Sequence, residues 1–102
     1  MFMNILKING GKLELRTDTG SYIRTICSQG VVDADLSHDG SLIVVTLSNG
    51  KVELRKDSGS YIRTIVLQNA VSARWSGNDI AVRLSNGKTE LRKESGSYIR
   101  TI

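Results

Sequence analysis

Gly50 to Ile65 reads GKVELRKDSGSYIRTI, and nearly the same stretch occurs three times in the chain. The other two copies are Gly11 to Ile26 (GKLELRTDTGSYIRTI) and Gly87 to Ile102 (GKTELRKESGSYIRTI). The second and third copies differ at two of their sixteen positions, and the first and second differ at three. The copies are offset by 39 and 37 residues. This repeat predicts an architecture in which each unit packs against its neighbours.

The middle period contains four short stretches with strand character, separated by turn signals. They cover residues 31–36, 41–47, 51–55 and 61–65. Asn49-Gly50 favours a two-residue type I′ hairpin, because both central residues of that turn need positive φ. A three-residue loop over 57–59 would place its glycine in the left-handed region. We therefore predict an all-β fold of four-stranded antiparallel meanders.

In the first copy, Gly10-Gly11 is expected to form the two-residue loop. Together these loops fix a register that charge can test. Opposite charges then meet across the strands in every copy, as expected where like charges directly opposed are unfavourable. The predicted ladders are Lys7–Glu14–Arg24, Thr46–Glu53–Arg63 and Arg83–Glu90–Arg100. The same loops place Arg16, Arg55 and Arg92 opposite Tyr22, Tyr61 and Tyr98.

The composition is that of a soluble globular chain, with 39% apolar and 24% charged residues. One histidine and one cysteine leave little material for a metal site or for a nucleophile with its base, so we predict no enzyme activity, no metal and no cofactor. The aliphatic run from Leu42 to Val45 is too short to cross a membrane. Lys7 interrupts the apolar stretch near the start, so no secretory signal is expected. Cys27 has no partner for an internal disulfide, which favours a cytoplasmic location.

Four strands in about 38 residues is the period of a propeller blade. The order of motifs resembles a WD-repeat β-propeller. VVDADLSHDG and AVSARWSGN are similar to that family's first strand and turn, SLIVVTLSNG to its second strand, KVELRKDSG to its third and SYIRTI to its fourth. The Trp-Asp pair expected after the third strand is replaced by Arg16-Thr17, Arg55-Lys56 and Arg92-Lys93. The Gly-His pair before the first strand is replaced by Gln29-Gly30 and Gln68-Asn69.

We predict a single domain over residues 1–102 with three blade-like repeats, namely 1–26, which lacks the first strand of the pattern, 27–65 and 66–102. Three blades cannot close a ring, since propellers have roughly four to eight. The expected assembly is a homodimer of six blades, because homo-oligomers are usually closed and symmetric. A swapped strand or a three-stranded first sheet would account for the absent strand. A two-chain β-sandwich and a fragment of a longer protein are the rival architectures.

The candidate ligand-binding residues are Arg16, Tyr22, Arg55, Tyr61, Trp75, Arg92 and Tyr98. Each tyrosine with its arginine suits a cation–π contact, or a repeated carbohydrate platform like that of the small-blade lectins whose subunits form propellers. Trp75 is expected either in the core or stacked on a ligand.

Acidic residues of the first strands suggest either an ion pair or a metal site. Asp35 is expected to pair with Arg74 of the next repeat. Asp33, Asp35, His38 and Asp39 are metal-ligating types, but SHDG lies where the family has a plain turn, and the third repeat has Ser72 and Arg74 at the aspartate positions. Cys27 aligns with Val66, which predicts a buried apolar thiol.

The predicted function is a non-enzymatic scaffold for protein partners, as the resemblance to propellers implies. One alternative is a lectin with one sugar site in each blade. A second is weak nucleic-acid binding by a basic rim, because the net charge of +4 comes from the three copied segments. We expect no membrane partner.

Overall fold

The computed structural model describes residues 4–102, and every regular element in that part of the chain is a β-strand. The strands are β1 (Ile5–Asn9), β2 (Lys12–Arg16), β3 (Tyr22–Cys27), β4 (Val31–Leu36), β5 (Leu42–Leu47), β6 (Val52–Lys56), β7 (Tyr61–Val66), β8 (Ala70–Ser76), β9 (Asp79–Leu84), β10 (Thr89–Arg92) and β11 (Tyr98–Thr101).

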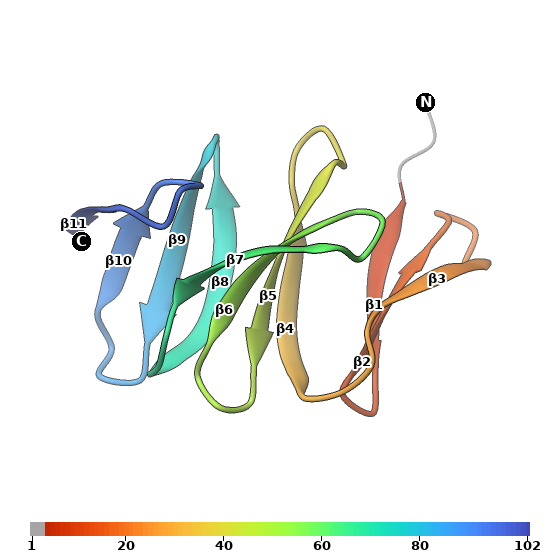
Figure 1. Cartoon of the computed structure of the whole chain (residues 1–102), viewed down its shortest axis with the longest axis horizontal. Coiled ribbons are helices and arrows are strands. Elements are labelled where there is room, and N and C mark those ends of the chain that lie inside the picture. The colour runs from red at the N-terminus through yellow and green to blue at the C-terminus, as the bar shows by residue number, and fades with distance from the viewer. Residues whose placement is uncertain (1–3) are drawn as a thin grey trace.

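The strands form three antiparallel sheets that follow the order of the chain. They are β1-β2-β3, β4-β5-β6-β7 and β8-β9-β10-β11. The sheets stand in a row along the 37 Å axis of the molecule, with the first and last copies at opposite ends (Figure 1). The all-β class and the antiparallel four-stranded meander are thereby confirmed. The division into repeats 1–26, 27–65 and 66–102 stays our prediction, and residues 1–3 lie outside the described part.

The middle sheet is buried on both faces, as the run of aliphatic residues in β5 requires. Ile43, Val44 and Val45 are all 0% exposed. Ile43 and Val45 pack with Leu13 and Leu15 of the first sheet, while Val44 joins an apolar cluster with the third sheet. Successive side chains of a strand point to opposite faces, so one continuous apolar run supplies both cores.

The β1–β2 hairpin has the predicted two-residue loop. Gly10 and Gly11 both have positive φ, at 59° and 83°. Lys7 consequently lies opposite Glu14, as expected.

The two-residue loop predicted at Asn49-Gly50 is wrong. Leu47 N donates to Lys51 O at 2.9 Å, so the loop has three residues, and Gly50 alone of these has positive φ. A type I turn followed by a left-handed glycine is the common three-residue hairpin. Thr46 therefore lies opposite Val52 instead of Glu53.

The third sheet has the same three-residue loop, because Leu84 N donates to Lys88 O at 2.8 Å. Arg83 lies opposite Thr89 instead of Glu90. The β5–β6 and β9–β10 parts of the predicted charge ladders are thus displaced by one residue.

The other half of each ladder is wrong because the outer strands are bulged. Between β6 and β7 the register shifts twice, which leaves Ile62 and Ile65 as the extra residues. Both isoleucines pack into the apolar cluster, so the bulges keep them facing the core. Arg63 then lies opposite Leu54. Equivalent shifts place Arg24 opposite Leu15 and Arg100 opposite Leu91.

The register beside the hairpin loops is confirmed, since the arginines at the ends of β2, β6 and β10 face the predicted tyrosines. The pairs are Arg16–Tyr22, Arg55–Tyr61 and Arg92–Tyr98.

Glycine-to-alanine substitutions at Gly50 and Gly87 separate backbone strain from lost space between sheets. Both glycines have φ of 87°, so alanine meets the same left-handed strain at either position. A Cβ at Gly50 would lie 2.5 Å from Asn69 N, whereas at Gly87 it meets no atom of the described residues within 4 Å. We expect Gly50→Ala to lower the free energy of unfolding by about 3 kcal/mol and Gly87→Ala by about 1 kcal/mol. Urea denaturation measures both, and equal losses would contradict the close approach of the sheets at Gly50.

Candidate functional site

Each sheet carries the same cluster of a glutamate, an arginine and a tyrosine. The three clusters are Glu14–Arg16–Tyr22, Glu53–Arg55–Tyr61 and Glu90–Arg92–Tyr98. In the middle cluster, Arg55 Nε and Nη2 donate to Glu53 Oε1 at 3.2 and 3.0 Å, and Nη1 donates to Gly59 O at 2.9 Å. The partner of each glutamate is therefore the arginine two residues later in the same strand, because residues i and i+2 share a face.

The three ion pairs are partly shielded from solvent and share one geometry. The Nη2–Oε1 distances are 2.7, 3.0 and 2.9 Å for the first, second and third pair. The carboxylate side chains are only 9, 16 and 22% exposed. Each arginine is neutralised by its own glutamate, so these positions supply little free positive field for an anionic ligand.

The three tyrosines form a repeated, half-exposed surface. Their exposed fractions are 55, 53 and 54%. Each hydroxyl is hydrogen-bonded to a threonine hydroxyl three residues later, at 3.0, 2.8 and 2.6 Å. The first and third arginines lie 5.9 Å from the centroid of their tyrosine ring, as a cation–π contact requires. The cation–π contact predicted for every blade is absent between Arg55 and Tyr61 among the described residues. Arg55 Nη1 there also donates to Ile26 O of the first sheet at 3.3 Å.

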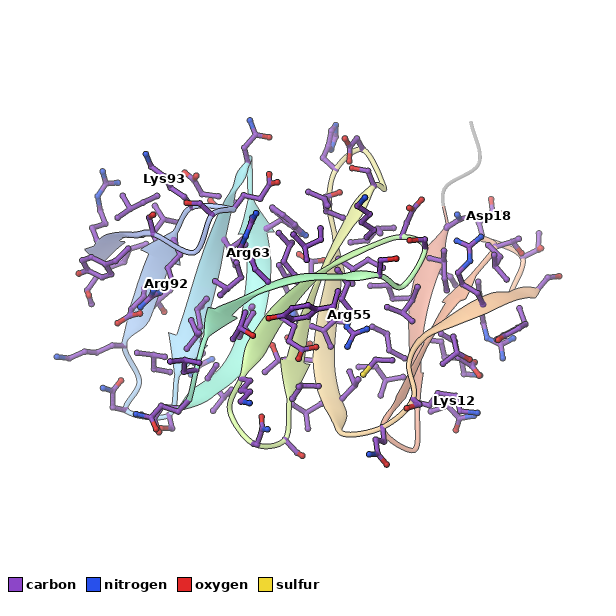
Figure 2. All side chains as sticks on the ribbon, viewed as in Figure 1. Lys12, Asp18, Arg55, Arg63, Arg92 and Lys93 are labelled. Atoms are coloured by element: carbon purple, nitrogen blue, oxygen red, sulfur yellow. The ribbon has the colours of Figure 1, made fainter. Side chains whose placement is uncertain are left out.

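Arginines of the outer strands connect one sheet to the next. Arg24 Nη1 donates to Asp57 O at 2.8 Å, and Arg63 Nη1 donates to Glu94 O at 2.7 Å. Arg100 is the equivalent residue of the third sheet, and Asp18 is the equivalent loop residue of the first. Asp18 and the third copy, marked by Arg92 and Lys93, lie at opposite ends of the row of sheets (Figure 2).

The predicted Asp35–Arg74 ion pair is wrong, because Arg74 binds Asp33. Arg74 Nη1 pairs with the Asp33 carboxylate, and this hydrogen bond raises the pKa of the guanidinium. Asp35 Oδ2 instead accepts from Trp75 N at 2.8 Å, and Trp75 Nε1 donates to Asp35 O at 3.2 Å. Trp75 packs against the apolar cluster of the second and third sheets. Both aspartates of β4 thus accept hydrogen bonds from residues of β8 and stabilise the contact between the two strands.

The four metal-ligating residues of the middle repeat do not converge. Asp33 and Asp35 face β8, while Asp39 closes its own turn by accepting hydrogen bonds from the Ser37 and Ser41 hydroxyls at 2.8 and 2.6 Å. Within residues 4–102, no three His, Cys, Asp or Glu side chains are grouped to hold a metal ion.

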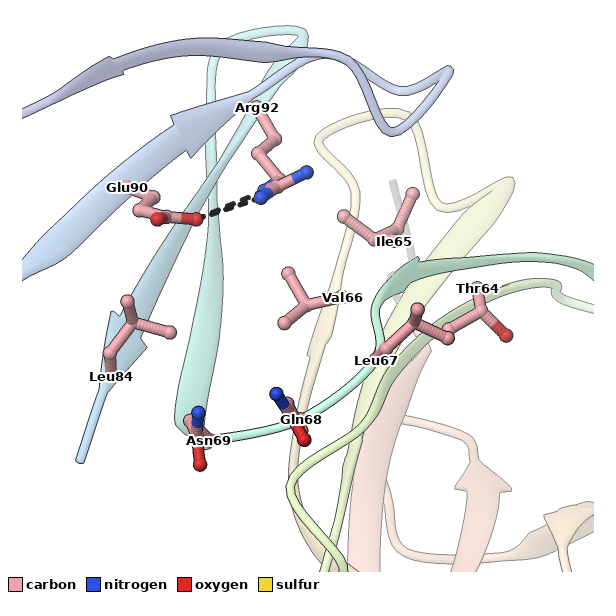
Figure 3. A pocket seen from close by; sticks show the side chains of 9 residues that line it. All are labelled: Thr64, Ile65, Val66, Leu67, Gln68, Asn69, Leu84, Glu90 and Arg92. Carbon is pink, nitrogen blue, oxygen red and sulfur yellow. Dashed lines mark hydrogen bonds and ion pairs between the residues drawn. The ribbon is translucent and has the colours of Figure 1, made fainter.

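A cavity of about 510 Å³ opens between β7 and β10 (Figure 3). The Glu90–Arg92 pair lines one side, and Leu67 lines the other with 74% of its surface exposed. Leu67 is not among the residues predicted from the sequence, although it aligns with Ser28 of the preceding repeat and is therefore an apolar residue at a turn position. Cys27 is a half-buried free thiol that packs against the apolar cluster between the first and second sheets.

No protein-family model matches the sequence, and no curated protein matches it. Among solved structures, the chain is similar to the β-propeller domain of Cps50 (Swd1) from Myceliophteria thermophila, with a TM-score of 0.68 and 15% sequence identity. The match covers 97% of this chain and 38% of that one. The fold is a run of propeller blades. The resemblance to WD-repeat propellers is confirmed at the level of fold, and the three sheets are called the first, second and third blade below.

The described residues, 4–102, include no helix with the length and apolar character needed to span a bilayer. The chain spans about 38% of the length of the propeller domain it matches.

Asp39 provides a test of the turn that closes the second blade's inner hairpin. The Ser41 hydroxyl, the Ser41 amide and the Ser37 hydroxyl lower the pKa of the Asp39 carboxyl from 3.8 to about 2. The ionised form is favoured in the folded state, so its contribution is complete above about pH 4 and is lost as the pH falls through about 2. We expect NMR titration of the carboxyl carbon to give this low midpoint, and Ser41→Ala to raise it toward 3.8. Ser60→Ala, in another loop, is the control. A midpoint near 3.8 in the unsubstituted protein would contradict these contacts.

Proposed function

We propose that this chain is a non-enzymatic protein-interaction module whose working unit is a propeller of two chains and six blades. The similarity to a propeller domain supports an interaction scaffold in general. The more specific part, the ring of two chains, is based on the arginine contacts between neighbouring blades, which Arg100 and Asp18 could repeat between two chains. We keep the cytoplasm as the proposed location, on the evidence of the single cysteine.

The blade-to-blade contacts repeat from one junction to the next. Arg24 joins the first blade to the Asp57 loop of the second, and Arg63 joins the second to the Glu94 loop of the third. Arg100 is exposed in β11, and Asp18 is exposed at the other end of the chain. A second copy would bring Arg100 to the Asp18 carbonyl of its partner, and two such junctions would close the ring.

The two end faces are more polar than the faces between blades. Ile80 and Val82 of β9 point toward the second blade, so Ala81 and Arg83 point away from it. On the first blade, Lys7 occupies the outward position opposite Glu14. Polar interfaces of this kind are typical of reversible association, so the proposed dimer should exchange with monomer.

Light scattering over a range of concentrations, from micromolar to sub-millimolar, tests the assembly. We expect the mass to rise from the 11.2 kDa of one chain toward about twice that value. Arg100→Ala should raise the dissociation constant about ten-fold or more, because it removes a charge-assisted hydrogen bond at each junction. Lys56→Ala removes an equal charge from the exposed end of β6 and should leave the mass unchanged. A constant monomer mass, or equal effects of the two variants, would overturn the ring.

A lectin is the second candidate, and the three equally exposed tyrosines favour it. Aromatic faces that recur with one geometry suit repeated weak contacts with sugars, whose combined strength exceeds that of one site. Tyr61→Ala should abolish binding on a glycan array, and Tyr61→Phe should retain most of it. Because the Tyr61 hydroxyl is already bonded to Thr64, the ring carries the interaction. An array without a positive glycan would exclude the lectin. Nucleic-acid binding has less support, since Arg16, Arg55 and Arg92 are paired with glutamates.

A further inference from the structure

The inner edge of the first blade differs from that of the other two. In the second and third blades, β5 and β9 are covered on that edge by β4 and β8, whereas β1 pairs only with β2 among the described residues. A cavity of about 300 Å³ lies beside this edge, between Asn4–Leu6 and Ala34–Leu36. We propose that this place, called the β1 edge site, binds one extended strand of a partner protein that carries a short carboxylate facing Leu36.

The contact between β4 and β8 indicates how such a strand would be held. Asp35 Oδ2 accepts from Trp75 N at 2.8 Å, and Asp33 Oδ2 accepts from Ala73 N at 3.4 Å. Leu36 and Ala34 occupy the same positions in β4 that Trp75 and Ala73 occupy in β8. Their amides thus point toward the β1 edge site, and no side chain of the described residues accepts from them. The shorter of the two bonds is the model for the carboxylate of the incoming strand.

The backbone of β1 offers the second set of contacts. A two-residue loop makes Asn9 and Lys12 a hydrogen-bonded closing pair, and the pattern alternates along the strand. The amides of Lys7 and Asn9 therefore point to β2, and those of Leu6 and Ile8 point to the open edge. Ile5 and Ile8 are 45 and 40% exposed, which leaves apolar surface beside those amides. An added strand can use both features.

The charge of Asp35 limits the partner strand to one acidic residue at this site. A residue of that strand equivalent to Asp33 would lie near Asp35, as Asp33 itself lies near Arg74. A second carboxylate there would meet a like charge, whereas an amide or a basic residue would not. The site therefore selects an extended segment with one acidic residue and a neutral or basic residue two positions before it.

A second copy of this chain does not provide the occupant from its described residues. Its inner strands β4 and β8 are already paired within their own blades. The inference goes beyond the proposed ring, because the inner edge of β1 is distinct from the outer contact between Arg100 and Asp18. The two ideas can therefore fail separately.

A peptide that copies the inner strand of the second blade is a suitable probe. We would use residues 29–38 with Asp33→Asn, which keeps the carboxylate of Asp35, and a matched control with Asp33→Asn and Asp35→Asn. The full ¹⁵N-labelled chain is titrated with each peptide, both unsubstituted and as Arg100→Ala. We expect saturable binding in both proteins and about ten-fold weaker binding of the control peptide.

Amide hydrogen exchange locates the bound strand. The amides of Leu6, Ile8 and Leu36 should exchange at least about ten-fold more slowly in the complex, while those of Lys7 and Asn9 stay unchanged. Ile8→Pro removes one edge amide without removing a bond to β2, and should abolish binding. If Ile8→Pro does not fold, N-methylation of the peptide at the residue facing Ile8 tests the same contact in the unaltered chain.

The proposal is overturned if no saturable shift occurs at peptide concentrations of about 1 mM. It is also overturned if the two peptides bind with equal affinity, or if protection falls on residues away from β1 and β4. Binding that is lost in Arg100→Ala would also overturn it, because the site would then depend on the ring.

Discussion

Burial of the second blade between its two neighbours is the constraint on which this structure depends. Ile43, Val44 and Val45 follow one another in β5, and all three are fully buried. A sheet with two aliphatic faces cannot be stable with either face in water, so it needs a blade on each side. The outer blades satisfy this need with Leu13 and Leu15 on one side and Ala73, Ile80 and Val82 on the other. The order of the chain then fixes the order of the blades.

Directional contacts determine how far apart the blades lie and how they are aligned. At both junctions, a backbone amide at the start of the inner strand donates to the carbonyl of a hairpin glycine, from Val31 to Gly11 at 2.9 Å and from Ala70 to Gly50 at 3.0 Å. The outer arginines make a second contact at the same two junctions. These bonds use residues of the sixteen-residue copies, which gives a physical reason for their near identity. The third copy retains Gly87 and Arg100, although no fourth blade follows within the described chain.

The sequence was sufficient for the strands, their antiparallel order and the arginine–tyrosine pairs, because hydrophobic alternation and glycine positions specify these features locally. It was insufficient for the charge ladders. Alternation with a period of two does not distinguish a two-residue loop from a three-residue loop. The one extra loop residue shifts the register, so that Thr46 lies opposite Val52 instead of Glu53. The bulges at Ile62 and Ile65 depend on packing against another blade, so the local sequence pattern does not predict them. The choice between Asp33 and Asp35 for Arg74 likewise depends on how β4 and β8 are staggered.

The two end faces of the row of blades carry polar side chains, together with an arginine, Arg100, that could make the same hydrogen bond to a second chain as its equivalents make between blades. Lys7 stands where the other blades have Val45 and Val82. On the third blade, Ala81 and Arg83 stand where the second has Val44 and Thr46, so an end-to-end junction buries less apolar surface than an inner one. Charge-assisted hydrogen bonds from Arg100 would set the geometry of such a junction and supply part of the affinity that its polar faces lack. Lys7 also lies in β1, the edge strand of the first blade, where a charged side chain opposes indiscriminate pairing with other strands. The first blade thus tolerates an open edge without inviting aggregation, which is the condition for an edge that admits one selected strand.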